Sequence, residues 1–574
     1  MSIVNGRGHL AGLRAFYRPD EQVSVSELPA GTRRVVVRQA TGKLTEGRLR
    51  EEGKDAAGAS AHFGELPHGT HSVEALGAGG LLLAEEFTSV GSHPGERPVH
   101  GFATSFDTAS VPATLEWIRA LRCTVVQIYD WMERYAAPLG PPQGWKDPSG
   151  RPVSYEALRS LVAGIRGEGG VAHAYSPVYA ADIPFAAKNP SLVMYRGDGG
   201  PQRFFENIQL ADPSNPEWQR HFSAAYGAAA DEIGFNGFHL DTYGYPRSAR
   251  GSDGTAVDMR AAYQSFLRAF RAARPSDLLS FNQVNGVPSA LTLPQEPVFR
   301  YCEVWPPNDR WRHLEALLDR SAGVAGRLGA VLGRQPLRGT IACYPAVWGA
   351  PDGEADGTSA ARGAARAASL RTVVLTEAIA TCLGAAALLY GDRVAALCDP
   401  YYPKHQRLLA AEAETVLEWH RFALRCRDLF LEGEDTSWYD IGDENGAVEV
   451  QWDGAVSAEP LGGGVLARVS RDPGWVAIAV VDLSGNANGS WSEPTQQGRC
   501  RAVRVRVLLD EPGSWQAAAA VLGRDGSRFE PLGFRVVGHR EGLAAEVDLP
   551  LGAGWSVLRM TKGHHDRDPD LLQM

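Results

Sequence analysis

The sequence predicts a multidomain protein in which a central (β/α)8 (TIM) barrel lies between an N-terminal and a C-terminal β-sandwich domain. At 574 residues the chain is too long for a single hydrophobic core. Between residues 99 and 428, short apolar runs alternate with long segments rich in Ala, Leu and Arg, which is the pattern of repeated strand–helix units. On either side of this region, short β-type runs are separated by turn residues, as in sandwiches.

The two flanking domains are predicted from runs of β-forming residues. Residues 1–98 contain QVSVSEL and RRVVVRQA and are expected to form an immunoglobulin-like β-sandwich, which ends in the linker SHPGERPVH. Residues 429–565 contain GGGVLARVS, WVAIAVVDLS and CRAVRVRVLLD and predict a second β-sandwich. Residues 566–574 are expected to be a tail.

Eight strands are predicted for the central barrel, with helices between them. The connection between the fifth and sixth strands, NGVPSALTLPQEP, has little room for a helix. The predicted strands are residues 100–106, 124–130, 170–176, 237–241, 278–284, 298–304, 339–345 and 385–392.

The composition excludes several classes of protein. The net charge is −10 and no stripe of Lys and Arg occurs, so a nucleic-acid partner is not expected. No run of about 18 apolar residues occurs, so we expect no membrane span. The first residues lack an apolar run of signal-peptide length, which predicts a cytoplasmic protein, or a secreted one if this sequence omits its leader.

The cysteines predict neither disulfides nor a metal site. Seven cysteines are scattered with no CxxC pair, which is typical of buried free thiols. No HExxH motif or phosphate-binding glycine loop is present, so we expect no metal and no organic cofactor. The 14 Trp and 17 Tyr would suit a carbohydrate-binding surface, although packing in cores explains most of them better.

Polar and aromatic residues gather where the predicted barrel strands end, which is the end of a barrel that carries the active site. The fourth strand, GFHLD, ends on a carboxylate at Asp241, and Glu303 ends the sixth. Cleavage of a glycosidic bond needs two carboxyl groups flanking that bond. Substrate-binding candidates from the same predicted rim are Tyr129, Asp130, Trp131, Tyr175, His239, Tyr243, Asn282, Trp305 and Asp392.

Each of these residues also has a structural interpretation. Asp241 could cap the helix that follows, since Asp is a favoured N-cap residue. Glu303 could belong to an ion pair, and Asp130 could pair locally with Arg134. His239 lies on the same strand face as Asp241 and could be a buried core histidine. Any one of the aromatic residues is about as well explained by packing.

The chain resembles glycoside hydrolase family 66, the dextranases and cycloisomaltooligosaccharide glucanotransferases. The resemblance rests on HGFATSF, QIYDWMERY, AHAYSPVYAA, GFHLDTYG, FNQVNG and YCEVWP, in that order. It implies a retaining, endo-acting enzyme for α-1,6-glucan, with Asp241 as nucleophile and Glu303 as acid/base. Within it, Asn282 is a candidate to hold the sugar 2-hydroxyl, and Asp392 to bind the glucose whose bond is cleaved.

Three other functions stay open at this point. The chain is shorter than typical family members and shows no large carbohydrate-binding insertion in the barrel, which favours hydrolysis over cyclisation. A glucanotransferase making linear or cyclic isomaltooligosaccharides is the first alternative. A non-catalytic α-glucan-binding protein is the second, and a hydrolase for another α-glycan is the third. The expected partner in each case is an oligo- or polysaccharide.

Overall fold

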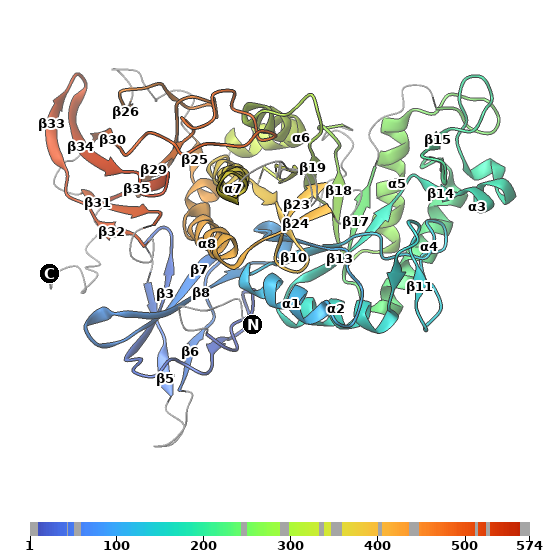
Figure 1. Ribbon diagram of the computed structural model, residues 1–574, viewed down its shortest axis with the longest axis horizontal. Helices are drawn as coiled ribbons and strands as arrows, with labels where there is room; N and C mark the ends of the chain where they lie inside the picture. The colour runs from blue at the N-terminus through green and yellow to red at the C-terminus, as the bar shows by residue number, and fades with distance from the viewer. Residues whose placement is uncertain are drawn as a thin grey trace.

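The fold is taken from a computed structural model of the chain (Figure 1). Three regions follow one another, with the N-terminal sheets in blue, a large curled sheet with its helices in the middle and the C-terminal sheets in orange and red. The described residues are 10–42, 44–50, 59–242, 249–287, 298–331, 338–345, 359–399, 404–435, 447–510, 515–523 and 528–562.

Two sheets make up the N-terminal region. They run in the orders β1-β8-β7-β3-β4 and β2-β6-β5. One hydrophobic cluster joins them, because Val23 and Val25 of β2 pack with Val35 and Val37 of β3. The strands are β1 Phe16–Tyr17, β2 Val23–Val25, β3 Arg34–Gln39, β4 Leu44–Glu46, β5 Arg48–Arg50, β6 Ser60–Gly64, β7 Gly69–Leu76 and β8 Leu82–Val90.

The central sheet has eleven strands in the order β21-β20-β19-β18-β17-β13-β10-β9-β22-β23-β24. Neighbours are parallel from β21 to β22, and the β22-β23-β24 end is antiparallel. The strands are β9 His100–Ala103, β10 Val125–Ile128, β13 Val171–Pro177, β17 Gly237–Asp241, β18 Leu278–Asn282, β19 Val298–Glu303, β20 Thr340–Ala342, β21 Ala386–Leu388, β22 Tyr390–Gly391, β23 Ala395–Asp399 and β24 Lys404–Arg407. All eight predicted strands are present in this curled sheet, while its closure into a (β/α)8 barrel stays a prediction.

Helices follow most of the parallel strands. Each is placed by local sequence: α4, for example, is capped by Asn215, begins with Pro216 and ends at Gly234, whose φ of +98° favours glycine. Among the described residues no helix lies between β18 and β19, although residues 288–297 of that connection lie outside them. The helices are α1 Val111–Ala120, α2 Tyr155–Gly167, α3 Ile183–Lys188, α4 Pro216–Ile233, α5 Met259–Ala273, α6 Trp311–Val331, α7 Ser359–Cys382 and α8 Ala410–Glu432, with short 3-10 turns η1 Ala78–Gly80, η2 Pro94–Glu96 and η3 Pro190–Leu192.

Two small sheets that the sequence did not predict are inserted after β10 and β13. A hairpin of β11 and β12 lies between β10 and α2, and a three-stranded sheet in the order β14-β16-β15 lies between β13 and α4. Their strands are β11 Trp145–Lys146, β12 Pro152–Val153, β14 Ala180–Asp182, β15 Arg203–Phe204 and β16 Ile208–Leu210. Since both insertions follow the C-terminal ends of parallel strands, they stand at the same end of the sheet as Asp241.

The C-terminal region also consists of two facing sheets. One runs β25-β28-β29-β35-β31-β32, with β27 beside β28, and the other runs β26-β30-β34-β33. Val450 and Val505 of one sheet share a hydrophobic cluster with Val469 and Ile478 of the other. The strands are β25 Glu434–Asp435, β26 Val448–Gln451, β27 Val456–Ser457, β28 Val465–Asp472, β29 Trp475–Asp482, β30 Ala502–Leu509, β31 Trp515–Val521, β32 Glu530–Pro531, β33 Arg535–His539, β34 Gly542–Pro550 and β35 Trp555–Lys562.

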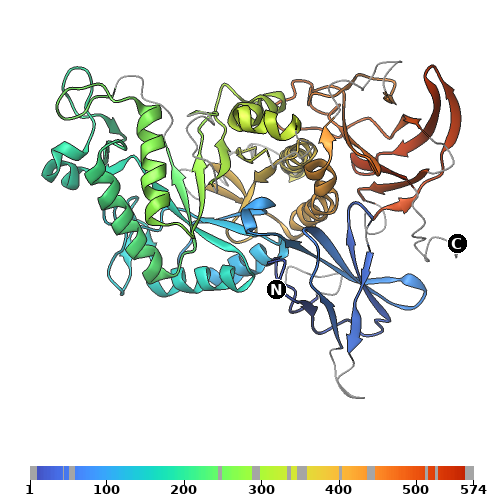
Figure 2. The ribbon, with the colours of Figure 1, turned by 180° about the vertical axis from the view of Figure 1, so that it is seen from behind.

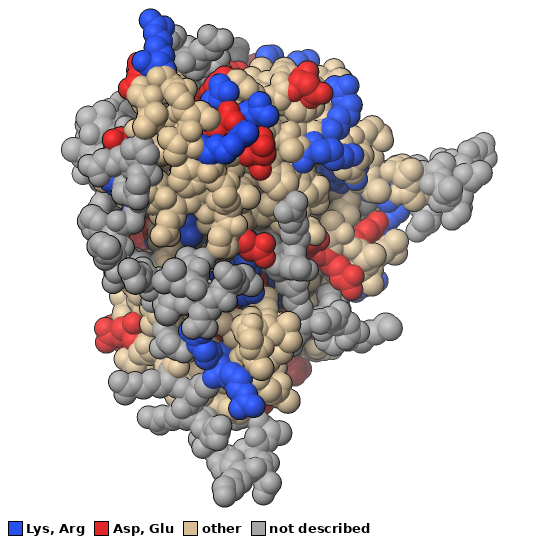
Figure 3. Space-filling model, turned by 90° about the vertical axis from the view of Figure 1, so that its left-hand side faces the viewer, with Lys and Arg blue, Asp and Glu red and all other residues tan. Residues whose placement is uncertain are grey.

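Both flanking regions lie against the same side of the central sheet. Figures 1 and 2 place the blue and red sheets beside α7 and α8, while α3 to α5 lie at the opposite end. On the side seen in Figure 3, basic and acidic residues are interspersed. The predicted domain limits are not tested by these observations, and residues 563–574, which include the predicted tail, lie outside the described residues.

The cysteines agree with the sequence-based expectation of free thiols. All seven cysteines are free thiols, and six of them are buried. Among the described residues, no helix combines the length and hydropathy needed to cross a bilayer.

Candidate active site

Strand β17 places Asp241 inside the curled sheet because side chains alternate along a strand. Phe238 points outward and packs against Phe270 of α5, with ring centroids 5.0 Å apart. His239 and Asp241 therefore point inward, and Asp241 is 8% exposed. The next helix, α5, is capped by Asp258, so Asp241 does not serve as its N-cap.

A single amide joins the two candidate carboxyl groups. Asn282, at the end of β18, donates from Nδ2 to Asp241 Oδ1 at 2.7 Å and to Glu303 Oε2 at 3.0 Å. The backbone N–H of Glu303 donates in turn to Asn282 Oδ1 at 3.2 Å. Because both carboxylate oxygens bond to one nitrogen, the distance between the two oxygens cannot exceed the sum of the two hydrogen-bond lengths. That limit is compatible with the roughly 5–5.5 Å between carboxyl groups in retaining glycosidases.

Two tyrosine hydroxyls complete the contacts of the pair. Tyr175 of β13 donates to Asp241 Oδ2 at 2.7 Å, and Tyr344 donates to Glu303 Oε1 at 2.8 Å. Tyr175 was among the predicted site residues, whereas Tyr344 was not. The sequence does indicate this position, because Tyr344 follows β20 at the same rim, in the run ACYP.

The surroundings of Asp241 favour its protonated form more than water does. Burial raises the pKa of Asp241, and the charge of Glu303 raises it further. The hydrogen bonds from Asn282 and Tyr175 act in the opposite direction and stabilise the ionised form. Protonation of Asp241 is therefore linked to the charge on Glu303.

Aromatic rings form the floor beneath the carboxyl groups. The rings of Tyr129 and Tyr175 lie 4.4 Å apart, and Phe102 lies 5.3 Å from Tyr129. His239 lies in the same layer, 6.1 Å from the Tyr175 ring, and shares a hydrogen bond of 2.9 Å with Ser280 Oγ. Burial lowers the pKa of His239 to about 3, so the imidazole is neutral. At 2% exposure His239 fits the core-histidine interpretation, in which it supports the floor.

Asp130 lies at the rim beside an arginine that the sequence did not single out. Its carboxylate is 3.6 Å from Arg151, whereas the local alternative had named Arg134 as its partner. Burial raises the pKa of Asp130 to about 7, although Arg151 acts to lower it. Asp147 holds Arg151 in place, accepting from its Nε at 2.6 Å.

The remaining candidates differ in what they contact. Trp131 is fully buried, and its indole N–H donates to the Tyr175 carbonyl, so it supports Tyr175 and has no surface to offer a sugar. Trp305 is partly exposed and lies 5.7 Å from the Tyr344 ring, beside Glu303. Tyr243 lies outside the described residues.

Asp392 ties neighbouring segments together. It accepts hydrogen bonds from the backbone N–H and the hydroxyl of Thr104, at 2.8 and 2.6 Å, and lies 3.2 Å from His405 Nε2. Burial alone would raise the pKa of Asp392, but the bonds from His405 and Thr104 outweigh it and hold the pKa below its usual range. Its oxygens are thus already engaged by protein groups.

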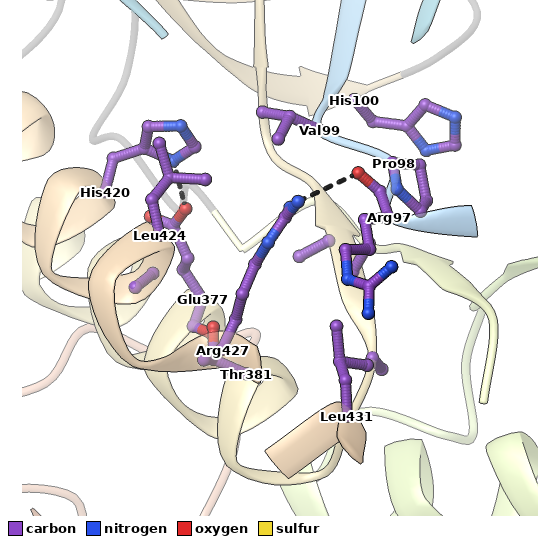
Figure 4. Close-up of a pocket in the computed structure, with 14 residues that line it drawn as sticks. Arg97, Pro98, Val99, His100, Glu377, Thr381, His420, Leu424, Arg427 and Leu431 are labelled. Carbon is purple, nitrogen blue, oxygen red and sulfur yellow. Dashed lines mark hydrogen bonds and ion pairs between the residues drawn. The ribbon is translucent and has the colours of Figure 1, made fainter. Parts of the chain in front are cut away.

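A separate pocket lies at the other end of the strands, where β9 begins (Figure 4). Two of its charged side chains bond to protein groups: Glu377 contacts His420 at 2.5 Å, and Arg427 donates to the Arg97 carbonyl at 3.0 Å. This pocket lies at the interface between β9, α7 and α8, remote from the carboxyl pair. Within the described part of the chain, no group of three or more His, Cys, Asp or Glu side chains is arranged to hold a metal ion.

The geometry offers two carboxyl groups, held together by neutral donors above an aromatic floor. The comparison with known families agrees with the motifs that bring these groups together, because the profile of glycosyl hydrolase family 66 matches residues 83–550. The chain belongs to glycosyl hydrolase family 66. The resemblance predicted from the sequence motifs is confirmed.

Relatives within the family align over limited segments. A cycloisomaltooligosaccharide glucanotransferase of Niallia circulans is 25% identical over 284 residues, covering 44% of this chain and 30% of that protein. A dextranase of Streptococcus salivarius is 26% identical over 168 residues, covering 25% of this chain and 20% of that protein. The chain thus matches less than a third of the length of either relative.

A solved structure shares the fold over nearly the whole chain. It is a cycloisomaltooligosaccharide glucanotransferase from Paenibacillus sp., complexed with cycloisomaltoheptaose. The TM-score is 0.75 at 16% identity, and the alignment covers 95% of this chain and 98% of that one. The shared fold therefore extends across both flanking regions.

Proposed function

We propose that this family 66 protein is a retaining, endo-acting glycoside hydrolase that cleaves α-1,6-glucosidic linkages of dextran or isomaltooligosaccharides. The observation that carries the proposal is the Asn282 amide, which bonds to Asp241 and Glu303 at once. Two carboxyl groups within this reach of one another suit a double-displacement reaction. The printed names of the relatives, a dextranase and glucanotransferases of isomaltooligosaccharides, support an α-1,6-glucan substrate.

In the proposed mechanism, ionised Asp241 attacks the anomeric carbon while Glu303 protonates the leaving oxygen. The bond from the anomeric carbon to that oxygen breaks, and a β-glucosyl ester of Asp241 forms. Glu303, now ionised, removes a proton from water, which attacks the ester and frees Asp241. Asn282 and Tyr175 stabilise the Asp241 carboxylate before attack, through bonds of 2.7 Å each.

We also infer that the curled sheet is a closed (β/α)8 barrel. Leu389 alone separates β21, which pairs with β20, from β22, which pairs with β9. Residues 386–391 would thus act as an eighth strand that joins the two edges of the seven-stranded arc. Closure would bring the ends of β13, β17, β18 and β19 around one opening, as catalysis by Asp241 and Glu303 requires.

Transglycosylation is the second candidate reaction, favoured by the whole-chain fold similarity to a cyclising glucanotransferase. In that case a sugar hydroxyl replaces water in the second step. A purely binding function is disfavoured because a binder has no need of two carboxyl groups held by one amide, one of which has a raised pKa. Product chromatography after incubation with dextran, pullulan, starch and short isomaltooligosaccharides separates hydrolysis, transfer and a different linkage preference.

The catalytic roles are tested with Asp241→Asn and Glu303→Gln. Both variants should lose at least about 10²-fold in the rate of reducing-end release from dextran. With an α-isomaltosyl fluoride, whose leaving group needs no protonation, Glu303→Gln should regain initial fluoride release and Asp241→Asn should not. Asp258→Asn, which retains an N-cap, and the exposed Glu418→Gln serve as matched controls. Losses below tenfold in both variants would exclude the assignment.

A further inference from the structure

An exposed phenylalanine stands at the tip of the hairpin formed by β15 and β16. Phe205 is 61% exposed, and its φ of +58° lies in the left-handed region that non-glycine residues rarely adopt. Both features work against folding, since the ring remains in water and the backbone is strained. A large, mostly exposed aromatic side chain on a strained backbone suits a binding surface better than it suits folding.

Aromatic contacts connect Phe205 to the candidate nucleophile. The ring of Phe205 lies 4.4 Å from that of Phe204, and Phe204 meets Tyr179 edge to face at 5.8 Å. Tyr179 is buried and close enough to influence the pKa of Tyr175, whose hydroxyl donates to Asp241. Phe204, Phe205 and Tyr179 thus form a ring cluster on the same side of the site as Tyr175.

The tip is also held against the rim of the site. The Asn207 side chain, two residues after Phe205, hydrogen-bonds the Tyr135 hydroxyl and acts to lower the pKa of that tyrosine. Tyr135 belongs to the segment after β10 that carries Asp130. The hairpin itself is anchored through β16, which pairs with β14 next to α3 (Figure 1). The phenylalanines are therefore placed by two neighbouring segments of the rim.

We propose that Phe204 and Phe205 form a distal subsite that binds one glucose unit of a long glucan chain. The inference rests on the proposed function, because it takes the cleaved bond to lie between Asp241 and Glu303. The C–H face of a glucose ring packs on an aromatic face, and phenylalanine supplies that apolar contact without a hydroxyl. A chain long enough to reach the tip gains this contact, and a short oligosaccharide does not.

The test compares long dextran with a short isomaltooligosaccharide as substrates for Phe205→Ala and Phe205→Trp. Phe205→Ala should raise KM for dextran about threefold to tenfold, the loss expected for one aromatic stacking contact. Its kcat, and both constants for the short substrate, should not change. Phe205→Trp should keep the wild-type KM, because it restores an aromatic face.

Leu81→Ala is the matched control, since Leu81 is 65% exposed on the N-terminal sheets, away from the hairpin. Melting temperatures establish that each variant is folded. An unchanged KM for dextran in Phe205→Ala, or an equal rise for long and short substrates, would overturn the subsite.

A failure of the proposed function gives a different result. If the wild type cleaves none of the glucans, its mobility is measured by electrophoresis in gels containing dextran. If dextran slows the migration of the wild type and of Phe205→Trp but not of Phe205→Ala, the subsite is supported even without cleavage. Equal mobility of all variants overturns it.

Discussion

Asn282 sets the geometry of the candidate active site because its one side-chain amide donates to both carboxyl groups. Its own carbonyl oxygen is held by the Glu303 backbone N–H, at 3.2 Å, and its backbone carbonyl accepts from Thr242 Oγ1. The amide is 2% exposed and so cannot turn away into solvent. A buried neutral donor fixed on two sides suits the stabilisation of charge that moves between two carboxyl groups.

Replacing Asn282 by Ala removes the donor shared by Asp241 and Glu303. We expect kcat/KM on dextran to fall about 10²-fold, comparable to the loss of one preorganised donor in other enzymes. Steady-state kinetics measures this, with Asn488→Ala as the control, since Asn488 bonds only to Glu493 on the surface. A folded Asn282→Ala variant with less than a threefold loss would show that the shared amide does not matter.

Tyr175→Phe should change the pH dependence of the first step. The hydrogen bond from the Tyr175 hydroxyl acts to lower the pKa of Asp241, so its removal raises that pKa. Asp241 must be ionised to attack, and activity is therefore lost as the pH falls through its pKa. The acidic limb of fluoride release from α-isomaltosyl fluoride should move to higher pH in Tyr175→Phe. A limb that stays in place, or moves to lower pH, would contradict this role of the hydrogen bond.

Strand alternation made the inward residues predictable, but not their partners. The run GFHLD predicted that His239 and Asp241 share a face, and the structure agrees. Arg151 was not predictable as the partner of Asp130, because the hairpin of β11 and β12 that brings it back has strands of two residues. Such short strands carry no periodic signal. His405, the partner of Asp392, likewise returns through an antiparallel pair beyond the eighth predicted strand.

At the scale of elements, β17 can lie close to β13 because Gly237 has no side chain. A Cβ at this position would lie 2.4 Å from the His173 ring. His173 is itself buried in the layer of rings below the carboxyl groups. An added Cβ at Gly237 must therefore displace either the buried His173 and Val171 side chains or the strand that ends in Asp241.

Gly237→Ala should lower the free energy of unfolding by about 1–3 kcal/mol, which is typical of overpacking in a core. It should also reduce kcat, because β17 carries the nucleophile. Gly227→Ala, on helix α4, is the matched control: its Cβ would meet only Arg274 side-chain atoms at 3.6 Å, and Ala favours a helix. Denaturant titration of both variants tests the prediction, and equal stability of the two would refute it.

Long, strongly patterned elements were predictable, and inserted ones were not. All eight runs predicted as barrel strands are strands, and β17 has the predicted bounds of 237–241. The sheet β14-β16-β15, which supports Phe205, consists of strands of two or three residues inside a connection. Tertiary pairing with the segment after β13, rather than local sequence pattern, stabilises it.

At the scale of the whole molecule, helix α8 joins the central region to the N-terminal sheets. Arg425 contacts Glu85 of β8 at 2.5 Å, with both side chains less than 10% exposed. Asp428, one turn further along α8, accepts a hydrogen bond from the Thr70 hydroxyl of β7 at 2.9 Å. The change from β-type runs to alternating strand and helix patterns predicted that separate regions exist. No local pattern could pair Arg425 with a carboxylate 340 residues away.

Arg425→Ala should destabilise the protein by about 3–5 kcal/mol, since it leaves Glu85 buried without its counter-charge. Arg504→Ala is the control, because Arg504 and Asp548 form an exposed pair on the C-terminal sheets, where about 0–1 kcal/mol is expected. Chemical denaturation followed by tryptophan fluorescence compares the two. Similar denaturation midpoints for both variants would show that the ion pair between α8 and β8 does not hold the two regions together.

Trapping of the covalent intermediate tests the central claim most directly. A 5-fluoro-α-glucosyl fluoride inactivator forms a slowly hydrolysed ester with the nucleophile of a retaining enzyme. After proteolysis, mass spectrometry should find one added sugar on the peptide that contains GFHLD, attached to Asp241. A sugar on any other carboxylate, or no adduct on an enzyme that cleaves dextran with inversion, would contradict the account.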